Sequence, residues 1–341
     1  MPPQLKLVDK YSLHRNSPSL LYNNLYPLGD NAFVYLSGNT VFRSTPGKKD
    51  LSCIASYTEP VINYFAAFFE QYGNVVAIVN QLSVDLYVSD KICVSLVYDK
   101  YALTRSIGVG NCVSLCLDKT GMICLFIGTS TGDLIYTDYD PLDSGDRTTR
   151  LVPKSSTNTH KLRSITALDA SHNYFYSPAR IVSADIGGNV VMWDKDRQPY
   201  CVIPSLDSES ECATAVKICG EGKLAAVSFG NGKVILYSTA DGHRNVEICA
   251  HARWINTMAC FHGFDAARRG DLLATAGEDG TVQLFKVDHS DGEVAALVCW
   301  LTSIQLSDVI PTGLCFEAGG KSIALSCYDI PSISVFAVSD L

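Results

Sequence analysis

The sequence lacks a long apolar run. No stretch approaches the roughly 20 apolar residues that a membrane-spanning helix needs. The opening residues, MPPQLKLVDKYSLHRN, also lack the apolar core that follows a basic start in a secretory signal. We therefore expect neither a spanning helix nor export through a secretory signal.

Positive charge is scarce. The chain has 27 Lys and Arg residues against 35 Asp and Glu residues, which gives a formal net charge of −8. Non-specific binding to nucleic acid or to anionic membranes depends on a positive field. Both kinds of partner are therefore disfavoured.

Signatures of metal binding, disulfide scaffolds and catalysis are missing. The 13 cysteines contain no C-x-x-C pair, and many alternate with apolar residues as buried strand thiols do. This pattern predicts a reducing, cytoplasmic setting with no metal site and no cofactor. The sequence has no Gly-rich phosphate loop with its Lys, no H-E-x-x-H and no G-x-S-x-G, so we expect no enzyme activity.

A repeated strand pattern organises the chain. Residues 251–287 contain three strand-like runs, and Asp279-Gly280 between the last two is a strong hairpin signal. Six related segments recur, and the third run of each copy ends on a residue of this series: Phe42, Tyr87, Thr137, Trp193, Tyr237, Phe285 and Phe336. Successive members are separated by 45, 50, 56, 44, 48 and 51 residues. These steps fit propeller blades of roughly 40–45 residues plus loop insertions.

The repeat predicts an all-β fold, a single seven-bladed β-propeller over residues 1–341. The last copy lacks an outer strand, whereas residues 4–11 form a spare strand-like run before the first blade. An open ring would leave unpaired strand edges and exposed blade faces. We therefore expect residues 1–12 to pair with the last blade and close the ring.

Two segments carry more specific expectations. The polar segment from Asp138 to His160 is predicted to hold the outer strand of the third blade near residues 148–152, and a binding or regulatory role for it stays open. The apolar run 294–301 is predicted to be an outer strand of the seventh blade, with Trp300 packed inside.

Histidine, hydroxyl and acidic residues recur at similar offsets. His251, Thr275 and Asp279 correspond to His160 and Ser183 in the blade that ends at Trp193. A catalytic triad needs an exposed nucleophile in a pocket, whereas a repeated triplet fits hydrogen bonds inside each blade. We therefore interpret these five residues, together with Trp193, as structural.

Loops that lead into the first strand of each blade are the expected binding surface. The candidate protein-binding residues are Trp254, Arg253 and Asn256 in one blade and Arg163 in another. Trp and Arg are enriched among binding hot spots. Packing of Trp254 across a blade interface is the competing interpretation.

The Trp193-Asp194 pair, the Asp279-Gly280 turn and the leading His251 resemble the WD40-repeat family. A closer resemblance, to one group within this family, is densest in the C-terminal half, at residues 229–234, 249–253 and 276–279, and residues 22–25, 143–146 and 328–329 extend it across the chain. It implies a seven-bladed, non-catalytic propeller in the cytoplasm, and it names no partner.

The primary hypothesis is a non-catalytic scaffold that presents loop surfaces to protein partners. One alternative is a substrate receptor of a cullin ubiquitin ligase. Such receptors close a blade with W-D-x-R, and here Arg197 stands one residue late. A second alternative is a propeller that binds a small molecule at the channel mouth.

Overall fold

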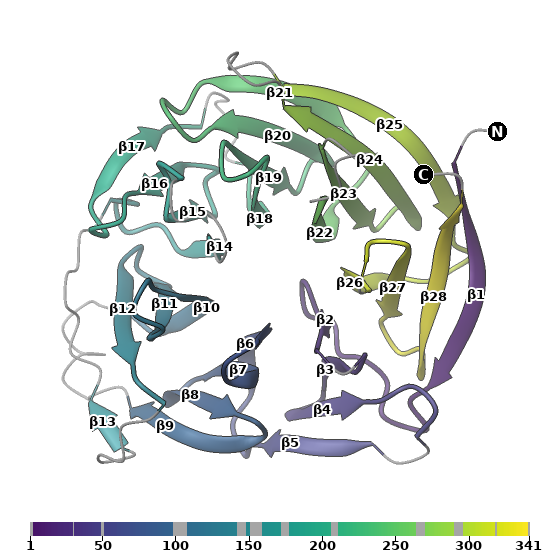
Figure 1. The fold of residues 1–341 in the computed structure, drawn as a ribbon, viewed down its shortest axis with the longest axis horizontal. Coiled ribbons are helices and arrows are strands. Elements are labelled where there is room, and N and C mark those ends of the chain that lie inside the picture. Colours follow the sequence, from purple (N-terminus) through teal and green to yellow (C-terminus); the bar gives the residue numbers. More distant parts are fainter. Residues whose placement is uncertain are drawn as a thin grey trace.

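The computed structural model describes residues 3–29, 31–48, 51–97, 108–141, 148–150, 159–171, 177–205, 211–263, 270–289, 296–317 and 319–339. These residues form strands, turns and irregular segments, with no helix among them. Seven sheets stand around a central axis as the blades of a ring (Figure 1). The predicted seven-bladed, all-β propeller is confirmed.

The first three blades follow one another along the chain. Blade one contains β2 (Tyr26–Pro27), β3 (Phe33–Ser37), β4 (Thr40–Ser44) and β5 (Ser52–Ser56). Blade two contains β6 (Val61–Phe69), β7 (Gly73–Asn80), β8 (Ser83–Val88) and β9 (Lys91–Val97). Blade three contains β10 (Gly110–Leu117), β11 (Ile123–Thr129) and β12 (Leu134–Tyr139).

The next three blades each have four antiparallel strands. Blade four contains β14 (Ile165–Ala170), β15 (Ile181–Asp185), β16 (Val190–Trp193) and β17 (Pro199–Ile203). Blade five contains β18 (Ala213–Cys219), β19 (Leu224–Phe229), β20 (Lys233–Ser238) and β21 (Arg244–Cys249). Blade six contains β22 (Ile255–Gly263), β23 (Gly270–Gly277), β24 (Thr281–His289) and β25 (Ala296–Gln305).

Blade seven joins the two ends of the chain. Its first three strands are β26 (Pro311–Phe316), β27 (Ser322–Cys327) and β28 (Ser332–Ser339). Its outer strand is β1 (Gln4–Ser12), which pairs antiparallel with β28 from Gln4 opposite Ser339 to Ser12 opposite Ser332. Figure 1 shows β1 lying along the outside of β28, with both termini beside this blade. The predicted ring closure is confirmed.

The hydrophobic core is divided among the interfaces between blades. Seven clusters of buried side chains are present, and each draws its members from two neighbouring blades. The cluster that crosses the closure point contains Leu25 and Phe33 of blade one with Ile333 and Val335 of blade seven. Because both faces of every blade are apolar, each blade needs a neighbour on each side.

A β-bulge opens the inner strand of six blades. In β6, β10, β14, β18, β22 and β26 the pairing register shifts between the first and third residue. In three blades the skipped residue donates a side-chain hydrogen bond to the first inner-strand residue of the next blade: Asn111 Nδ2 to Ile165 O at 2.7 Å, Thr166 Oγ1 to Ala213 O at 2.6 Å and Asn256 Nδ2 to Pro311 O at 2.9 Å. A bulge re-aims a side chain, and here it aims that side chain at the next blade.

Two outer strands differ from the sequence-based expectation. The strand predicted near residues 148–152 is β13 (Thr148–Arg150), and it pairs in parallel with β9 of blade two instead of closing blade three. The rest of the segment between residues 142 and 158 lies outside the described residues. The apolar run 294–301 contributes to β25, which belongs to blade six because it pairs with β24.

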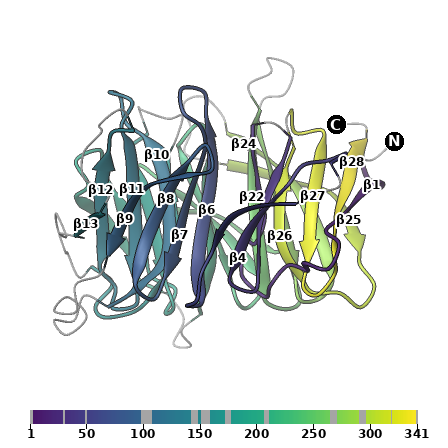
Figure 2. The same cartoon turned by 90° about the horizontal axis from the view of Figure 1, so that it is seen from below.

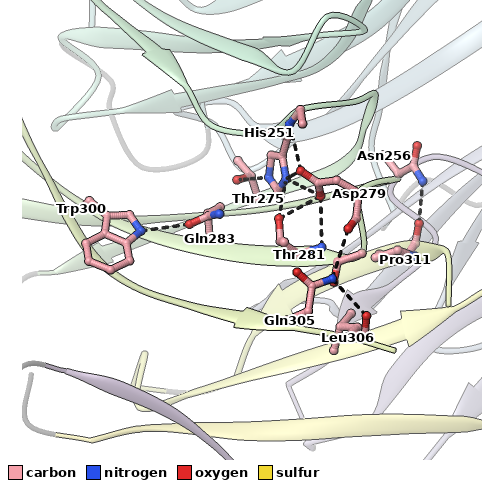
Figure 3. A network of polar contacts seen from close by, with 12 residues as sticks. His251, Asn256, Thr275, Asp279, Thr281, Gln283, Trp300, Gln305, Leu306 and Pro311 are labelled. Carbon is pink, nitrogen blue, oxygen red and sulfur yellow. Dashed lines mark hydrogen bonds and ion pairs between the residues drawn. The ribbon is translucent and has the colours of Figure 1, made fainter. Parts of the chain in front are cut away.

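The position of Trp300 also differs from the sequence-based expectation. Its side chain is 61% exposed, and its indole N–H donates to Gln283 Oε1 at 2.9 Å (Figure 3). The residue lies on β25, the outer strand of blade six, whose side chains are mostly exposed or half-buried, so the predicted packing of Trp300 inside the blade is wrong.

Deletion of residues 1–12 tests how much the closure strand contributes. The deletion removes eight register pairs between β1 and β28 and exposes the edge of β28. We expect the free energy of unfolding to fall by several kcal/mol, because each ladder hydrogen bond contributes about 0.5–1.5 kcal/mol. Thermal melting with light scattering should show a lower melting temperature and faster aggregation. Deletion of residues 1–3, which precede β1, is the control, and an unchanged melting curve for the longer deletion would contradict closure by β1.

Candidate functional site

The strand order places two sets of loops on one face of the ring. In each blade the inner strand runs from this face to the other, and the second strand returns (Figure 2). The loops that lead into inner strands and the turns between second and third strands therefore lie on the same side. We call this side the loop face. All four predicted protein-binding residues belong to it or to the strand starts just below it.

A hydrogen-bonded network fixes the loop before β22 (Figure 3). His251 Nε2 lies 2.8 Å from Thr275 Oγ1 on β23, and His251 Nδ1 lies 3.0 Å from Asp279 Oδ1 in the β23–β24 turn. Asp279 Oδ2 also accepts the backbone N–H of Ala252 at 2.9 Å. One imidazole and one carboxylate thus join a loop, a strand and a turn.

Blade four contains the same arrangement with a different acid. His160 Nε2 lies 2.8 Å from Ser183 Oγ, which also accepts the indole N–H of Trp193 at 2.9 Å. His160 Nδ1 lies 2.8 Å from Asp185 Oδ2. Sequence analysis missed Asp185, because it ends β15 instead of occupying the turn position equivalent to Asp279. An acidic residue two positions after the hydroxyl was the available signal.

The protonation of this network follows from its burial. Desolvation lowers the pKa of His251 below its ordinary value, against the opposing effect of Asp279. Burial alone would raise the pKa of Asp279, but hydrogen bonds from the Ala252 N–H, His251 and Thr281 outweigh it and lower that pKa. A neutral imidazole next to a carboxylate donates through Nδ1 and accepts the Thr275 hydroxyl at Nε2. Both hydrogen bonds connect parts of the same blade. Thr275, which would be the nucleophile of a catalytic triad, is fully buried.

The four predicted protein-binding residues have different environments. Arg253 and Arg163 are exposed on the loop face. Asn256 is 1% exposed and makes the bond to Pro311 O described above (Figure 3). Its expected exposure is therefore corrected: as the bulge residue of β22 it points into the junction between blades six and seven.

Trp254 is half-buried and packs across the loop face. Its ring stacks on that of Tyr22 of blade one, with centroids 6.0 Å apart and planes 22° apart. It also covers Gly230 of blade five, where a Cβ atom would lie 2.5 Å from the indole Cζ3. Only a glycine at position 230 leaves room for the indole. Tyr22 was not among the predicted site residues, since no local pattern connects it to a residue more than 200 positions away.

The segment that carries Tyr22 crosses the inner side of blade seven. The backbone N–H of Asn23 donates to Asn256 O at 3.2 Å, and the N–H of Asn24 donates to Thr312 O at 2.7 Å. Gly313 permits this approach, because a Cβ there would lie 2.3 Å from the carbonyl carbon of Asn24. Blade one is thereby connected directly to blade six.

Asn24 holds this segment in place. Its side chain is fully buried. Its Nδ2 donates to Ser19 O at 2.9 Å and to Leu36 O at 3.0 Å, and its Oδ1 accepts the Leu36 N–H at 2.7 Å and the Tyr64 hydroxyl at 2.9 Å. Both donors and both acceptor positions of this buried amide are used, so the side chain holds the segment in one backbone conformation.

Comparison with known proteins identifies the family. The family model described as WDR54 matches residues 123–339, which is more than half of the chain. The chain belongs to the WDR54 family. Curated relatives include WD repeat domain 54 of Rattus norvegicus, 28% identical over 160 residues, and WD repeat-containing protein 54 of Homo sapiens, 27% identical over 161 residues. These alignments cover 46% and 47% of this chain and 45% of each relative, so less than half of each relative's length is matched.

Solved structures support the fold of this WDR54-family chain. A chain from a crystal structure of the mitotic checkpoint complex superposes with a TM-score of 0.72 at 12% identity, covering 99% of this chain and 96% of that one. A chain from a crystal structure of BBS1N in complex with ARL6DN gives a TM-score of 0.72 at 11% identity, covering 100% and 98%. Identities this low establish the shared propeller and nothing about shared partners.

Arg197 of the WDR54-family chain is engaged within the ring. Its guanidinium pairs with Asp138 and lies 4.3 Å from the centroid of the Tyr136 ring, both in blade three. The side chain is 17% exposed. The arginine that the ligase-receptor hypothesis needs at a blade end therefore connects blade four to blade three.

Seven of the 16 exposed large apolar side chains among the described residues lie on the loop face of the WDR54-family chain. They lie in loops before inner strands or in turns between second and third strands: Leu20, Tyr22, Leu82, Leu162, Ile186, Ile310 and Tyr328. Leu162 is 67% exposed and stands next to Arg163.

Among the described residues, no helix has the length and apolar character required to cross a bilayer.

Substitution of Asp279 tests the structural interpretation of the His251 network. Asp279→Ala leaves the N–H groups of His251 and Ala252 without their acceptor. We expect the free energy of unfolding to fall by about 1–3 kcal/mol, the cost of an unsatisfied buried donor. Asp241→Ala, at an exposed turn, is the matched control in chemical denaturation. Equal stability of the two variants would contradict the structural role.

The lowered pKa of His251 predicts a pH dependence. Between pH 7 and 5 the unfolded chain protonates this histidine near its ordinary pKa of 6.5, while the folded chain does so only at lower pH. Stability contributed by neutral His251 is therefore present above about pH 6.5 and is lost as the pH falls below it. In His251→Gln the free energy of unfolding should depend less steeply on pH between pH 7 and 5. His243→Gln, at an exposed position, should leave the slope unchanged, and equal slopes for wild type and His251→Gln would count against this assignment.

Proposed function

We propose that this chain is a non-catalytic scaffold that holds a protein partner on its loop face. Membership of a WD-repeat family and the propeller fold support protein interaction in general. The observation that carries the more specific proposal is the set of seven exposed apolar side chains in the loops and turns of that face. The hydrogen-bonded His160 and His251 networks hold two of these loops in place, which lowers the entropy cost of binding.

The chemistry of the loop face indicates the chemistry of the partner. The Tyr22–Trp254 stack and neighbouring aliphatic side chains favour an apolar or aromatic anchor residue. Exposed Lys161, Arg163 and Arg253 in the loops of blades four and six favour acidic groups beside that anchor. We therefore propose a partner segment that combines an apolar anchor with flanking carboxylates.

The compartment is part of the same proposal. All 13 cysteines are free thiols, and Cys112, Cys116 and Cys124 are among those buried in the blades. Free thiols in such number fit a reducing environment. We therefore propose that the scaffold acts in the cytoplasm.

The ligase-receptor alternative has weaker support. An adaptor that reads an arginine at a blade end would have to compete with Asp138 and Tyr136 for Arg197. Copurification with a cullin adaptor, lost on Arg197→Ala, would favour this alternative.

Affinity capture with paired variants tests the scaffold. Baits carrying Arg163→Ala/Arg253→Ala or Tyr22→Ala should lose a common set of partners measured by quantitative mass spectrometry. For a purified partner, affinity should fall by more than about 1 kcal/mol for at least one loop-face substitution, as at interface hot spots. The melting temperature of the arginine variant should stay unchanged, because both side chains are exposed.

Controls separate the loop face from the rest of the ring. Lys195→Ala changes an exposed charge in the β16–β17 turn, on the opposite face, and should retain every partner. Trp254→Ala should lower both binding and stability, because the indole packs on Gly230 and Tyr22. Retention of the same partners by all loop-face variants would place the binding surface elsewhere.

A further inference from the structure

A cavity of about 430 Å³ lies in the channel toward the face opposite the loops. Much of its wall comes from the C-terminal ends of inner strands, with aromatic side chains such as Phe65 and Phe316 on one side. Asp169, Lys217, Cys260 and His262 contribute to the opposite side, from blades four, five and six. Titratable groups from three blades thus meet in one place.

Three metal-ligating atoms lie together beside this cavity, and two of them belong to Cys260 and His262, which line it. Cys260 and His262 are two residues apart on β22 and share one side of it, and Asp271 on β23 is the register partner of His262. The distances are 3.0 Å from His262 Nδ1 to Asp271 Oδ2, 3.9 Å from Cys260 Sγ to His262 Nδ1 and 3.9 Å from Cys260 Sγ to Asp271 Oδ2. All three atoms therefore fall within 4.8 Å of one another.

These three distances are close to the distances between ligand atoms in a tetrahedral zinc site. Zinc bond lengths of about 2.3 Å to sulfur and about 2.0–2.1 Å to nitrogen or oxygen place tetrahedral neighbours about 3.3 Å apart for N and O, and about 3.5 Å apart for S and N or O. Each of the three distances needs a change of about 0.4 Å or less to reach these values. Rotation of the side chains alone supplies shifts of this size.

Buried carboxylates accompany the thiol and the imidazole. Asp169 and Asp271 are 8% and 3% exposed, and Lys217 contributes one ammonium group to the same wall. Asp271 Oδ2 accepts the Gly220 N–H at 2.6 Å, which orients the carboxylate as an outer-shell bond does in metal sites.

We propose that Cys260, His262 and Asp271 bind one Zn²⁺ ion, with the fourth coordination position on the side of the cavity. A thiolate, an imidazole and a carboxylate are the three donors that zinc uses in proteins. An open fourth position takes water or an anionic ligand from the cavity. No sequence motif marks this site, because the donors are split between two strands and no C-x-x-C is present. Only the pairing of β22 with β23 aligns His262 with Asp271.

Cobalt substitution tests the site. Full-length protein, purified under reducing conditions and stripped with a chelator, is titrated with Co²⁺. We expect one equivalent to produce a thiolate-to-cobalt charge-transfer band and the visible bands of tetrahedral cobalt, both removed by Zn²⁺. Cys260→Ser should abolish the charge-transfer band. His262→Gln should weaken Zn²⁺ binding by at least the roughly 10–100-fold that loss of an outer-shell partner costs.

Matched variants distinguish this site from the other thiols. Cys249→Ser and His243→Gln change exposed residues of blade five and should retain both the spectrum and the affinity. Absence of the charge-transfer band in the wild type would overturn the proposal, as would its persistence in Cys260→Ser. If melting curves show that Cys260→Ser is unfolded, the partly exposed His262 provides the decisive variant, and unchanged affinity in His262→Gln would refute the site.

Discussion

The whole structure depends on burial of both faces of every blade. A four-stranded sheet with two apolar faces gains little stability by itself, because each face needs an opposing surface. Here the seven buried clusters occupy the seven junctions between neighbouring blades, including the junction between the first and the last. A ring is the arrangement that leaves neither terminal blade with a bare face. The pairing of β1 with β28 completes that arrangement with backbone hydrogen bonds.

Polar contacts add geometric specificity to this apolar ring. Asn111, Thr166 and Asn256 occupy bulges, and each donates to the start of the next inner strand. Near the channel, the segment that carries Tyr22 and Asn24 crosses blade seven to reach blade six. Blades one, six and seven are thereby joined beside the closure point. These contacts set the relative positions of the inner strands. Because the loops are attached to these strands, the same contacts also position the loops.

The two faces of the ring offer different chemistry. On the loop face, exposed aliphatic and aromatic side chains surround loops that internal His–hydroxyl–Asp networks hold in place. At the opposite end of the channel, a cavity brings together carboxylates, an ammonium group, a thiol and an imidazole. We propose a macromolecular partner for the first surface and a zinc ion for the second, and the residues of the two proposals do not overlap.

The sequence by itself determined the all-β class, the seven-fold repeat and the closing strand. Those features depend on hydrophobic alternation, turn residues and spacing, which are local or periodic. It also indicated most residues of the two hydrogen-bonded networks, but neither Asp185, whose position departs from the repeat, nor Thr281. Only the tertiary structure decided that Asn256 is buried, that Trp300 is exposed, that Trp254 stacks on Tyr22, and that Cys260, His262 and Asp271 converge. Bulges, strand neighbours and contacts between distant blades decide these side-chain positions. No local sequence pattern predicts those contacts.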